Sequence, residues 1–281
     1  MTASRPKLGL VVGGGGLPPS LIARCQASGR PFFVIRLKGF ADDQTLSAPH
    51  VTVGIAEIGK IIACLRAEAC QALCFAGLVQ RPDFASLKPD LKGLSLLPGV
   101  IAAAAQGDDG LMRHMLNIFE REGFQIEGAD QIGDDLTLPA GPLGLHAPQP
   151  THQSDISQAL RVARAMGELD IGQGCVVVAG LVLAVEAQEG TEAMLRRCIG
   201  LADAIKGNPD HRKGVLAKCP KPIQDLRIDM PTIGLSTVER AAEAGLSGIV
   251  GEAGRLLVLD RQAVIAAADA AGLFIFGAAA P

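Results

Sequence analysis

The charged residues between Lys218 and Asp229 have the types and spacing that could hold a phosphate group. Asp225, Arg227 and Asp229 alternate with apolar residues, so in an extended strand they fall on one face. Carboxylates suit a hard Mg²⁺ ion, and Lys or Arg side chains suit phosphate oxygens. Because alternate residues of a strand lie roughly 6–7 Å apart, the spacing alone is too large for a tight Asp225–Arg227 pair to be assumed. The alternative is a solvent-exposed strand face with surface ion pairs, although the flanking prolines favour a shaped edge segment and hence a site.

A second candidate site is a run of four glycines between an expected strand at 7–12 and an expected helix that ends at Ser28. Backbone N–H groups at a helix N-terminus bind anions, and missing Cβ atoms let a phosphate approach. The usual dinucleotide fingerprint fails because Pro19 replaces its third glycine and the second strand ends in Arg36 without an acid. NAD is therefore not expected, whereas Arg36 favours NADP slightly. We favour a phosphate-containing ligand without nicotinamide, bound by Gly13, Gly14, Gly15 and Gly16, with a tight strand–helix turn as the alternative.

Two acidic segments resemble helix starts. Glu186 and Glu189 lie at the end of a predicted strand and in a turn, and Thr191 can cap the helix that follows. Asp108 can cap a helix that runs to Glu122, and Asp109 beside it is either part of that cap or a carboxylate near the glycine run. The sequence contains no HxxH, HExxH, GxSxG or GxxxxGK[ST] pattern, so it does not support a histidine metal cluster, a serine-hydrolase triad or a P-loop.

The elements that must position these residues alternate between strand and helix. In the first half, strands at 7–12, 32–37 and 72–78 alternate with helices, which predicts a parallel sheet. The stretch 133–153 is rich in Pro and Gly and is predicted to be a domain linker. The second half begins with a helix at 154–169, followed by a hairpin of 175–179 and 182–187. A helix at 191–201, a strand at 214–219 and a helix capped by Ser236 and Glu239 follow.

Composition excludes several classes of protein. The 281 residues are 48% hydrophobic and carry 26 basic against 29 acidic side chains, with no Trp or Tyr. Near-neutral charge and missing aromatic stacking residues argue against nucleic-acid binding. No apolar run reaches the ~18 residues of a membrane span, and the N-terminal run is too short and broken for a signal peptide. The seven cysteines include no CxxC pair, so we expect buried free thiols in a cytoplasmic protein.

Several longer segments together resemble the LpxI family, the UDP-2,3-diacylglucosamine diphosphatases of lipid A biosynthesis. They are LGLVVGGGGLPPSLI, FAGLVQRPDF, GDDGLMRHML, VLAVEAQEGTEAML and KCPKPIQDLRIDMPTIGLSTVE. The resemblance extends through both halves of the chain in order. Its most specific part is the pattern K-x-x-K-P-x-Q-D-x-R-x-D-x-P-x-I-G from Lys218 to Gly234.

The resemblance implies a fold and a reaction. The expected fold is α/β, with an N-terminal Rossmann-like parallel-sheet domain (1–132), the linker (133–153), a C-terminal mixed α/β catalytic domain (154–281) and a ligand cleft between the domains. The expected reaction is Mg²⁺-dependent hydrolysis of UDP-2,3-diacylglucosamine to UMP and 2,3-diacylglucosamine 1-phosphate. A non-catalytic nucleotide-sugar or lipid carrier is the alternative. We also expect peripheral contact with the cytoplasmic face of the inner membrane, and a homodimer is a further expectation.

The resemblance also assigns roles to residues of this chain. The family's important aspartate matches Asp225, which is expected to bind metal or to position or deprotonate the attacking water. Metal binding is expected from Asp225, Asp229 and Glu189. Besides the glycine run, substrate binding is expected from Gln80, Asp109, Thr191, Lys218, Lys221, Gln224 and Arg227.

Overall fold

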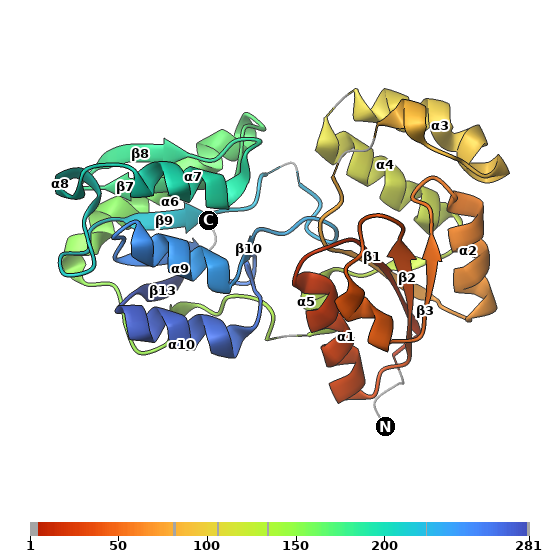
Figure 1. Cartoon of the computed structure of the whole chain (residues 1–281), viewed down its shortest axis with the longest axis horizontal. Helices are drawn as coiled ribbons and strands as arrows, with labels where there is room; N and C mark the ends of the chain where they lie inside the picture. Colours follow the sequence, from red (N-terminus) through yellow and green to blue (C-terminus); the bar gives the residue numbers. More distant parts are fainter. Residues whose placement is uncertain (1–4, 81–82, 106, 134, 223, 280–281) are drawn as a thin grey trace. The chain divides into compact units, whose positions relative to one another are not determined.

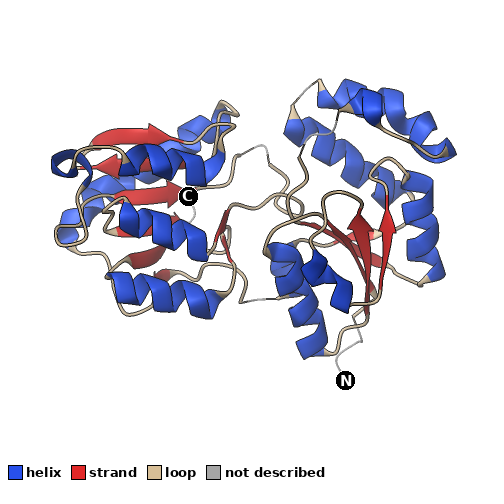
Figure 2. Cartoon of the chain, in the orientation of Figure 1, coloured by secondary structure: helices blue, strands red, loops and turns tan. Residues whose placement is uncertain are grey.

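The computed structural model describes residues 5–80, 83–105, 107–133, 135–222 and 224–279. The chain forms two compact units, Met1–Asp134 and Asp135–Pro281, each of which combines a sheet with helices (Figures 1 and 2). The ligand cleft expected between the two domains stays a prediction. No helix in the described ranges is both long and apolar enough to cross a membrane.

The first unit is built on a five-stranded sheet in which every neighbouring pair is parallel. The strand order β3-β2-β1-β4-β5 follows the 3-2-1-4-5 order of nucleotide-binding α/β folds through the fifth strand. In chain order the elements are β1 (Leu8–Val12), α1 (Leu17–Ser28), β2 (Phe32–Leu37), η1 (Asp43–Ser47), β3 (His50–Val53), α2 (Ile58–Ala67), β4 (Ala72–Ala76), η2 (Phe84–Ser86), α3 (Leu91–Ala104), α4 (Asp108–Arg121), β5 (Gln125–Ile126) and α5 (Ala129–Ile132).

Local sequence explains where these elements begin and end. All five residues of β1 are buried, as a strand covered on both faces requires. Helix α1 has Pro in its first turn and ends at Gly29, whose φ of 66° is a left-handed conformation that glycine adopts without strain. The predicted alternation of strand and helix is confirmed here. The predicted Asp108 cap is wrong, because α4 begins at Asp108 and its N-cap residue is Gly107.

The second unit is built on a mixed six-stranded sheet with the order β6-β13-β11-β9-β7-β8 and a separate pair β10-β12. Strands β13, β11 and β9 run parallel, whereas β6, β7 and β8 join through antiparallel pairs. The elements are β6 (Gly141–Leu143), η3 (Pro150–His152), α6 (Gln153–Glu168), β7 (Gly174–Val178), β8 (Leu181–Val185), α7 (Gly190–Ile199), α8 (Asp203–Lys206), β9 (Val215–Lys218), β10 (Thr232–Ile233), α9 (Leu235–Glu243), β11 (Gly248–Glu252), β12 (Leu257–Val258), α10 (Arg261–Ala271) and β13 (Phe274–Ala278).

Two buried apolar clusters cover the two faces of this sheet. Helix α6 contributes Ile156, Ala159 and Ala163 to one cluster. Helices α7, α9 and α10 contribute to the cluster on the other face. Because side chains alternate along a strand, β9 sends Leu216 toward the second face and Ala217 toward the first. The predicted hairpin is confirmed as β7-β8, and its turn residues Ala179 and Gly180 both have positive φ.

Three sequence-based predictions of local structure differ from the structure. Most of the predicted linker 133–153 lies in the second unit, where β6 is an edge strand and Leu138 is fully buried. Helix α9 begins at Leu235 with Gly234 as its N-cap, so Ser236 is not the cap. The segment after Lys221, predicted as an extended strand, forms turns instead. All seven cysteines are free, and every one except the half-buried Cys64 is buried.

Candidate active site at the carboxyl edge of the second sheet

The carboxyl ends of β9, β11 and β13 lie at one edge of the second sheet, because these strands are parallel. Strand β8 runs in the same direction as β9, so α7, which follows β8, begins at this edge. Helix α9 also begins at this edge, because it connects the end of β9 to the start of β11. Two helix N-termini therefore point at the edge of the sheet where open α/β folds bind ligands. Their first-turn N–H groups have no partners within the helices and favour an anion.

Lys218, the last residue of β9, brings a buried positive charge to this edge. Its side chain is on the α7 and α9 face, and the residue is 5% exposed. The ammonium Nζ donates to the Thr191 hydroxyl at 2.8 Å and to the Thr232 carbonyl at 3.0 Å. Thr191 lies in the first turn of α7 and Thr232 lies two residues before the N-cap of α9. Burial lowers the pKa of Lys218, while the charges of Glu186 and Asp229 raise it.

Glu186, which follows β8, is the residue of this cluster that was not predicted as a site residue. It is 6% exposed, and its Oε1 accepts a hydrogen bond from the Thr191 hydroxyl at 2.9 Å. Its Oε2 is buried without a hydrogen-bond partner among the described residues. The signal in the sequence is an acid directly after the apolar run LVLAV, which forms β8. Glu189, three residues later, instead binds Arg197 at 2.6 Å.

The segment that resembled a strand is folded into a turn around Asp225. The Asp225 carbonyl accepts from the N–H groups of Ile228 and Asp229, and its carboxylate accepts from the N–H group of Arg227. The Arg227 guanidinium binds both carboxylate oxygens, at 3.0 and 2.7 Å. Asp225 and Arg227 therefore form a tight pair, which the strand spacing alone left open. An Asp side chain that bonds the backbone two residues on favours such turns over a strand.

The remaining polar residues of the segment brace this turn. Gln224 donates from its side-chain amide to Asp229 Oδ2 and accepts from the Lys221 N–H group. The Lys221 ammonium binds Asp170 at 2.6 Å, just beyond the end of α6. The predicted residues of the second unit are thus arranged in two groups, one around Lys218 and one around Asp225, and the pKa of Lys218 responds to Asp229.

The structure fits part of the expected metal-ligand set. Within the described ranges, no group of three or more His, Cys, Asp or Glu side chains is placed to hold a metal ion. Glu189 does not fit, because Arg197 and the Ala187 N–H group occupy its carboxylate. Asp225 and Asp229 lie on one turn, and Mg²⁺ is usually held by one or two carboxylates together with substrate phosphates. The Arg227 guanidinium and N–H group occupy the Asp225 carboxylate, and Gln224 binds Asp229, so metal binding by Asp225 and Asp229 stays a prediction.

In the first unit, N–H groups of the glycine run form hydrogen bonds with other parts of the protein. The Gly13 and Gly14 N–H groups donate to the carbonyls of Ala76 and Leu78, and the Gly15 N–H group donates to Asp42 Oδ2 at 2.7 Å. A Cβ atom on Gly13 would lie 2.4 Å from the Leu78 oxygen. The loop after β4 therefore packs too close to this turn for a side chain at Gly13, which fits a tight strand–helix turn. Phosphate binding by Gly13–Gly16 stays a prediction.

The other predicted residues of the first unit are dispersed. Gln80 is exposed in the loop after β4. Asp109 lies in the first turn of α4 and pairs with Arg113 at 2.7 Å. Arg36, which favoured NADP, is buried and donates to Thr45, Thr52 and loop carbonyls. Its guanidinium therefore stabilises the β2–η1 connection.

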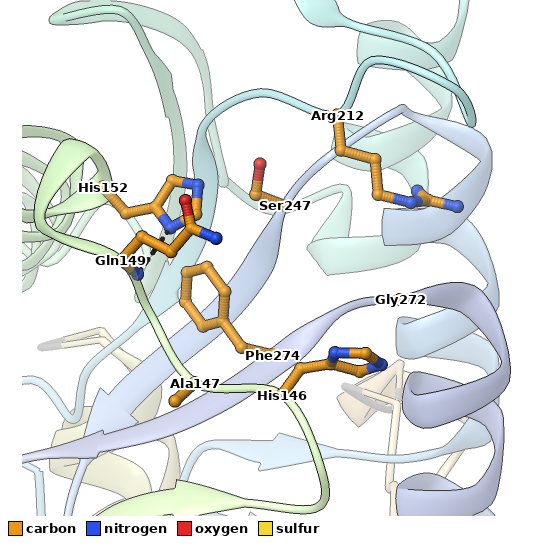
Figure 3. Close-up of a pocket in the computed structure, with 8 residues that line it drawn as sticks. All are labelled: His146, Ala147, Gln149, His152, Arg212, Ser247, Gly272 and Phe274. Atoms are coloured by element: carbon orange, nitrogen blue, oxygen red, sulfur yellow. Dashed lines mark hydrogen bonds between the residues drawn. The ribbon is translucent and has the colours of Figure 1, made fainter.

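A pocket of about 240 Å³ lies at the opposite edge of the second sheet, next to Ser247 and Phe274 where β11 and β13 begin (Figure 3). Its His152 ring stacks on Phe274, and His152 Nδ1 accepts from the Gln149 N–H group. Arg212 turns away from His152 and donates to the carbonyls of Ala242 and Leu246 at the end of α9. Because helix C-termini repel anions, this pocket lacks the electrostatics of the Lys218 edge.

Comparisons with known proteins agree with the resemblance seen in the sequence. Residues 7–136 match the model of the LpxI N-terminal domain, and residues 139–276 match that of the LpxI C-terminal domain. The chain belongs to the LpxI family. It is 60% identical over 271 residues to a Caulobacter vibrioides protein named UDP-2,3-diacylglucosamine pyrophosphatase LpxI, covering 96% of this chain and 97% of that protein.

The two LpxI domain models correspond to the two structural units. The N-terminal model covers all five strands of the first sheet, and the C-terminal model starts just before β6. The LpxI C-terminal domain therefore contains both the Lys218 cluster and the Asp225 turn.

Proposed function

We propose that this protein hydrolyses the pyrophosphate bond of UDP-2,3-diacylglucosamine to UMP and 2,3-diacylglucosamine 1-phosphate. The observation that carries the proposal is the 60% identity, over 96% of the chain, to a protein named for that substrate. The geometry at the carboxyl edge of the second sheet supports it, because a buried cation and two helix N-termini suit a pyrophosphate.

The chain's own residues have distinct tasks in this proposal. Lys218 and the first turns of α7 and α9 bind the pyrophosphate oxygens and stabilise the charge that develops during hydrolysis. Water attacks the sugar-side phosphorus, the anhydride P–O bond breaks, and UMP leaves. Arg227 holds the Asp225 carboxylate through two hydrogen bonds, so Asp225 is oriented either to bind a metal or to position and deprotonate the water.

Mg²⁺ is the metal that we propose for this reaction. A bound divalent ion polarises phosphoryl oxygens and neutralises their charge. Asp225 and Asp229 would hold it, together with oxygens of the substrate. The Arg227 guanidinium binds both Asp225 oxygens, so metal binding by Asp225 would require this pair to loosen.

We also propose that the protein contacts a membrane surface through α3. The exposed face of this helix carries Leu91, Leu94 and Ile101, which are 90%, 58% and 48% exposed. Among the described side chains of α3, Lys92 is the only charged one, and it pairs with Glu122. Exposed apolar side chains grouped on one helix favour contact with an apolar phase such as the acyl region of a bilayer.

The test of the reaction is UMP release from UDP-2,3-diacylglucosamine, measured with and without Mg²⁺. We expect release by the wild type that stops in EDTA and returns with Mg²⁺. Asp225→Ala should lose turnover by about 10³-fold or more while still binding substrate. The matched control is Asp210→Ala, which removes an exposed aspartate of the same unit.

Three results would contradict parts of this proposal. Turnover by Asp225→Ala at the wild-type rate would remove Asp225 from the mechanism. Activity that ignores chelation would exclude the Mg²⁺ role. Tight lipid binding without UMP release under any divalent ion would favour the carrier function instead.

A further inference from the structure

Three polar side chains form a directed chain of hydrogen bonds behind the Lys218 ammonium group. Lys218 Nζ donates to Thr191 Oγ1 at 2.8 Å, and Thr191 Oγ1 donates to Glu186 Oε1 at 2.9 Å. An ammonium group only donates and an ionised carboxylate only accepts, so the direction of both bonds is fixed. The Thr191 hydroxyl must present its lone pair to Lys218 and its hydrogen to Glu186. The negative charge of Glu186 therefore acts on Lys218 through this hydroxyl.

The backbone around Glu186 is shaped to hold its carboxylate in place. The Glu186 N–H group donates to the Gly174 carbonyl at 2.8 Å. A Cβ atom on Gly174 would lie 2.4 Å from Glu186 Oε2, and one on Gly172 would lie 2.0 Å from the Glu186 carbonyl oxygen. The backbone contact at Gly172 requires glycine, and a side chain at Gly174, the first residue of β7, would displace the Glu186 carboxylate. Both glycines therefore leave room for Glu186.

The charges around Lys218 make this support necessary. The ammonium group is buried, and its described hydrogen-bond partners, the Thr191 hydroxyl and the Thr232 carbonyl, carry no charge. Burial of a cation favours loss of its proton. The charged groups that act on it are Glu186 from the end of β8 and Asp229 from the Asp225 turn. Of these two, only Glu186 is connected to Lys218 through a described hydrogen-bond chain.

We propose that Glu186 is a positioning residue, which acts through the Thr191 hydroxyl to hold the Lys218 ammonium group at the anion-binding edge of the sheet. Two of the three ammonium hydrogens are used by Thr191 and Thr232, so the third is available to a phosphate oxygen. The proposal rests on the proposed function for the identity of that phosphate. The hydrogen-bond chain itself does not depend on it.

Substitutions of Glu186 and of Thr191 test the charge and the connecting hydroxyl group independently. Glu186→Gln keeps a hydrogen-bond acceptor for Thr191 but removes the negative charge. Thr191→Val removes the hydroxyl, whereas Thr191→Ser retains it. Glu243→Gln is the matched control, because it removes the same charge from an exposed residue in the last turn of α9.

Two measurements report how these substitutions change the protonation of Lys218. The first is the pH profile of kcat/KM for UMP release. Removing the Glu186 charge favours the neutral amine, so the alkaline limb should move to lower pH, with a loss of roughly tenfold or more at high pH and a smaller loss near neutrality. The second is the pH titration of the Lys218 Cε resonance in ¹³C-lysine-labelled protein, assigned with Lys218→Met. Its midpoint should move to lower pH in Glu186→Gln and Thr191→Val, and stay in place in Thr191→Ser and Glu243→Gln.

The two measurements also distinguish failure of this proposal from failure of the proposed function. A purely structural role for Glu186 would lower stability and scale the rate equally at every pH, with an unchanged Lys218 midpoint, and that result would overturn the proposal. If the wild type releases no UMP but the Lys218 midpoint still moves, the positioning role stands and the proposed reaction fails.

Discussion

Replacement of Lys218 by methionine tests whether this buried lysine serves function at the expense of stability. Methionine has a similar volume and no charge, so Lys218→Met keeps the packing on the α7 and α9 face. The matched control is Lys206→Met. Lys206 is also buried, with a side chain 7% exposed, but it has an acidic partner in Asp203 at 2.9 Å.

The structure sets the size of the expected effects. Lys218→Met loses two hydrogen bonds from a charged donor, worth about 1.5–3 kcal/mol each. It also removes the cost of burying an ammonium group, which is several kcal/mol. The two terms nearly cancel, so the free energy of unfolding should stay within about 2 kcal/mol of the wild-type value. In contrast, loss of a preorganised cation at a phosphate site should lower kcat/KM by about 10²–10³-fold.

Urea unfolding followed by circular dichroism measures the first quantity, and UMP release measures the second. Lys206→Met should retain wild-type kcat/KM, because Lys206 contacts Asp203 and the Gly207 carbonyl on the far side of the unit. Global unfolding of Lys218→Met would show that Lys218 is mainly structural. Wild-type activity in that variant would refute the placement of the anion site at this edge of the sheet.

Two further predictions follow from burial and exposure. Burial raises the pKa of Cys175 and of Cys219 to about 12, so unfolded thiols ionise from pH 9 upward while these two stay neutral. The free energy of unfolding should therefore fall as pH rises above about 9, by about 1 kcal/mol per thiol at pH 10. Urea unfolding at pH 8 and pH 10 measures this fall, which should be smaller in Cys219→Ala than in the wild type. Substitution of Leu91 and Leu94 by serine should weaken sedimentation with phosphatidylcholine vesicles containing phosphatidylglycerol at least several-fold. Serine at the exposed Leu145 and Leu181 of the second unit is the control, and equal loss in both variants would contradict an α3 contact.

Several elements followed from local sequence because their determinants are local. The apolar run before the glycines could only be a buried strand, and Gly29 ended the next helix through its left-handed φ. The hairpin at Ala179–Gly180 followed from its turn residues and flanking apolar runs. The resemblance to the LpxI family also needed only the order of residue types, and the comparisons confirm it.

Other features depended on contacts between residues far apart in the sequence. The alternation around Asp225 predicted a strand, but the Asp225 side chain bonds its own backbone and Arg227, which stabilises a turn instead. Most of the predicted linker is part of the second unit, because Leu138 hydrogen-bonds Leu256 and Gly254 and β6 pairs with β13, more than a hundred residues away. The local sequence pattern does not show which conformation these segments adopt, because that depends on the hydrogen-bond and packing partners that the fold brings to them.

The sequence by itself determined the family, the alternating α/β pattern and the charged residues that are available for chemistry. Only the tertiary structure decided that the Gly13–Gly15 N–H groups are used internally, that Glu189 binds Arg197, and that Glu186 supports Lys218. The physical reason is that a side chain's role depends on its burial and its hydrogen-bond partners. In this protein those partners come from strands and helices that meet only when the sheet has formed.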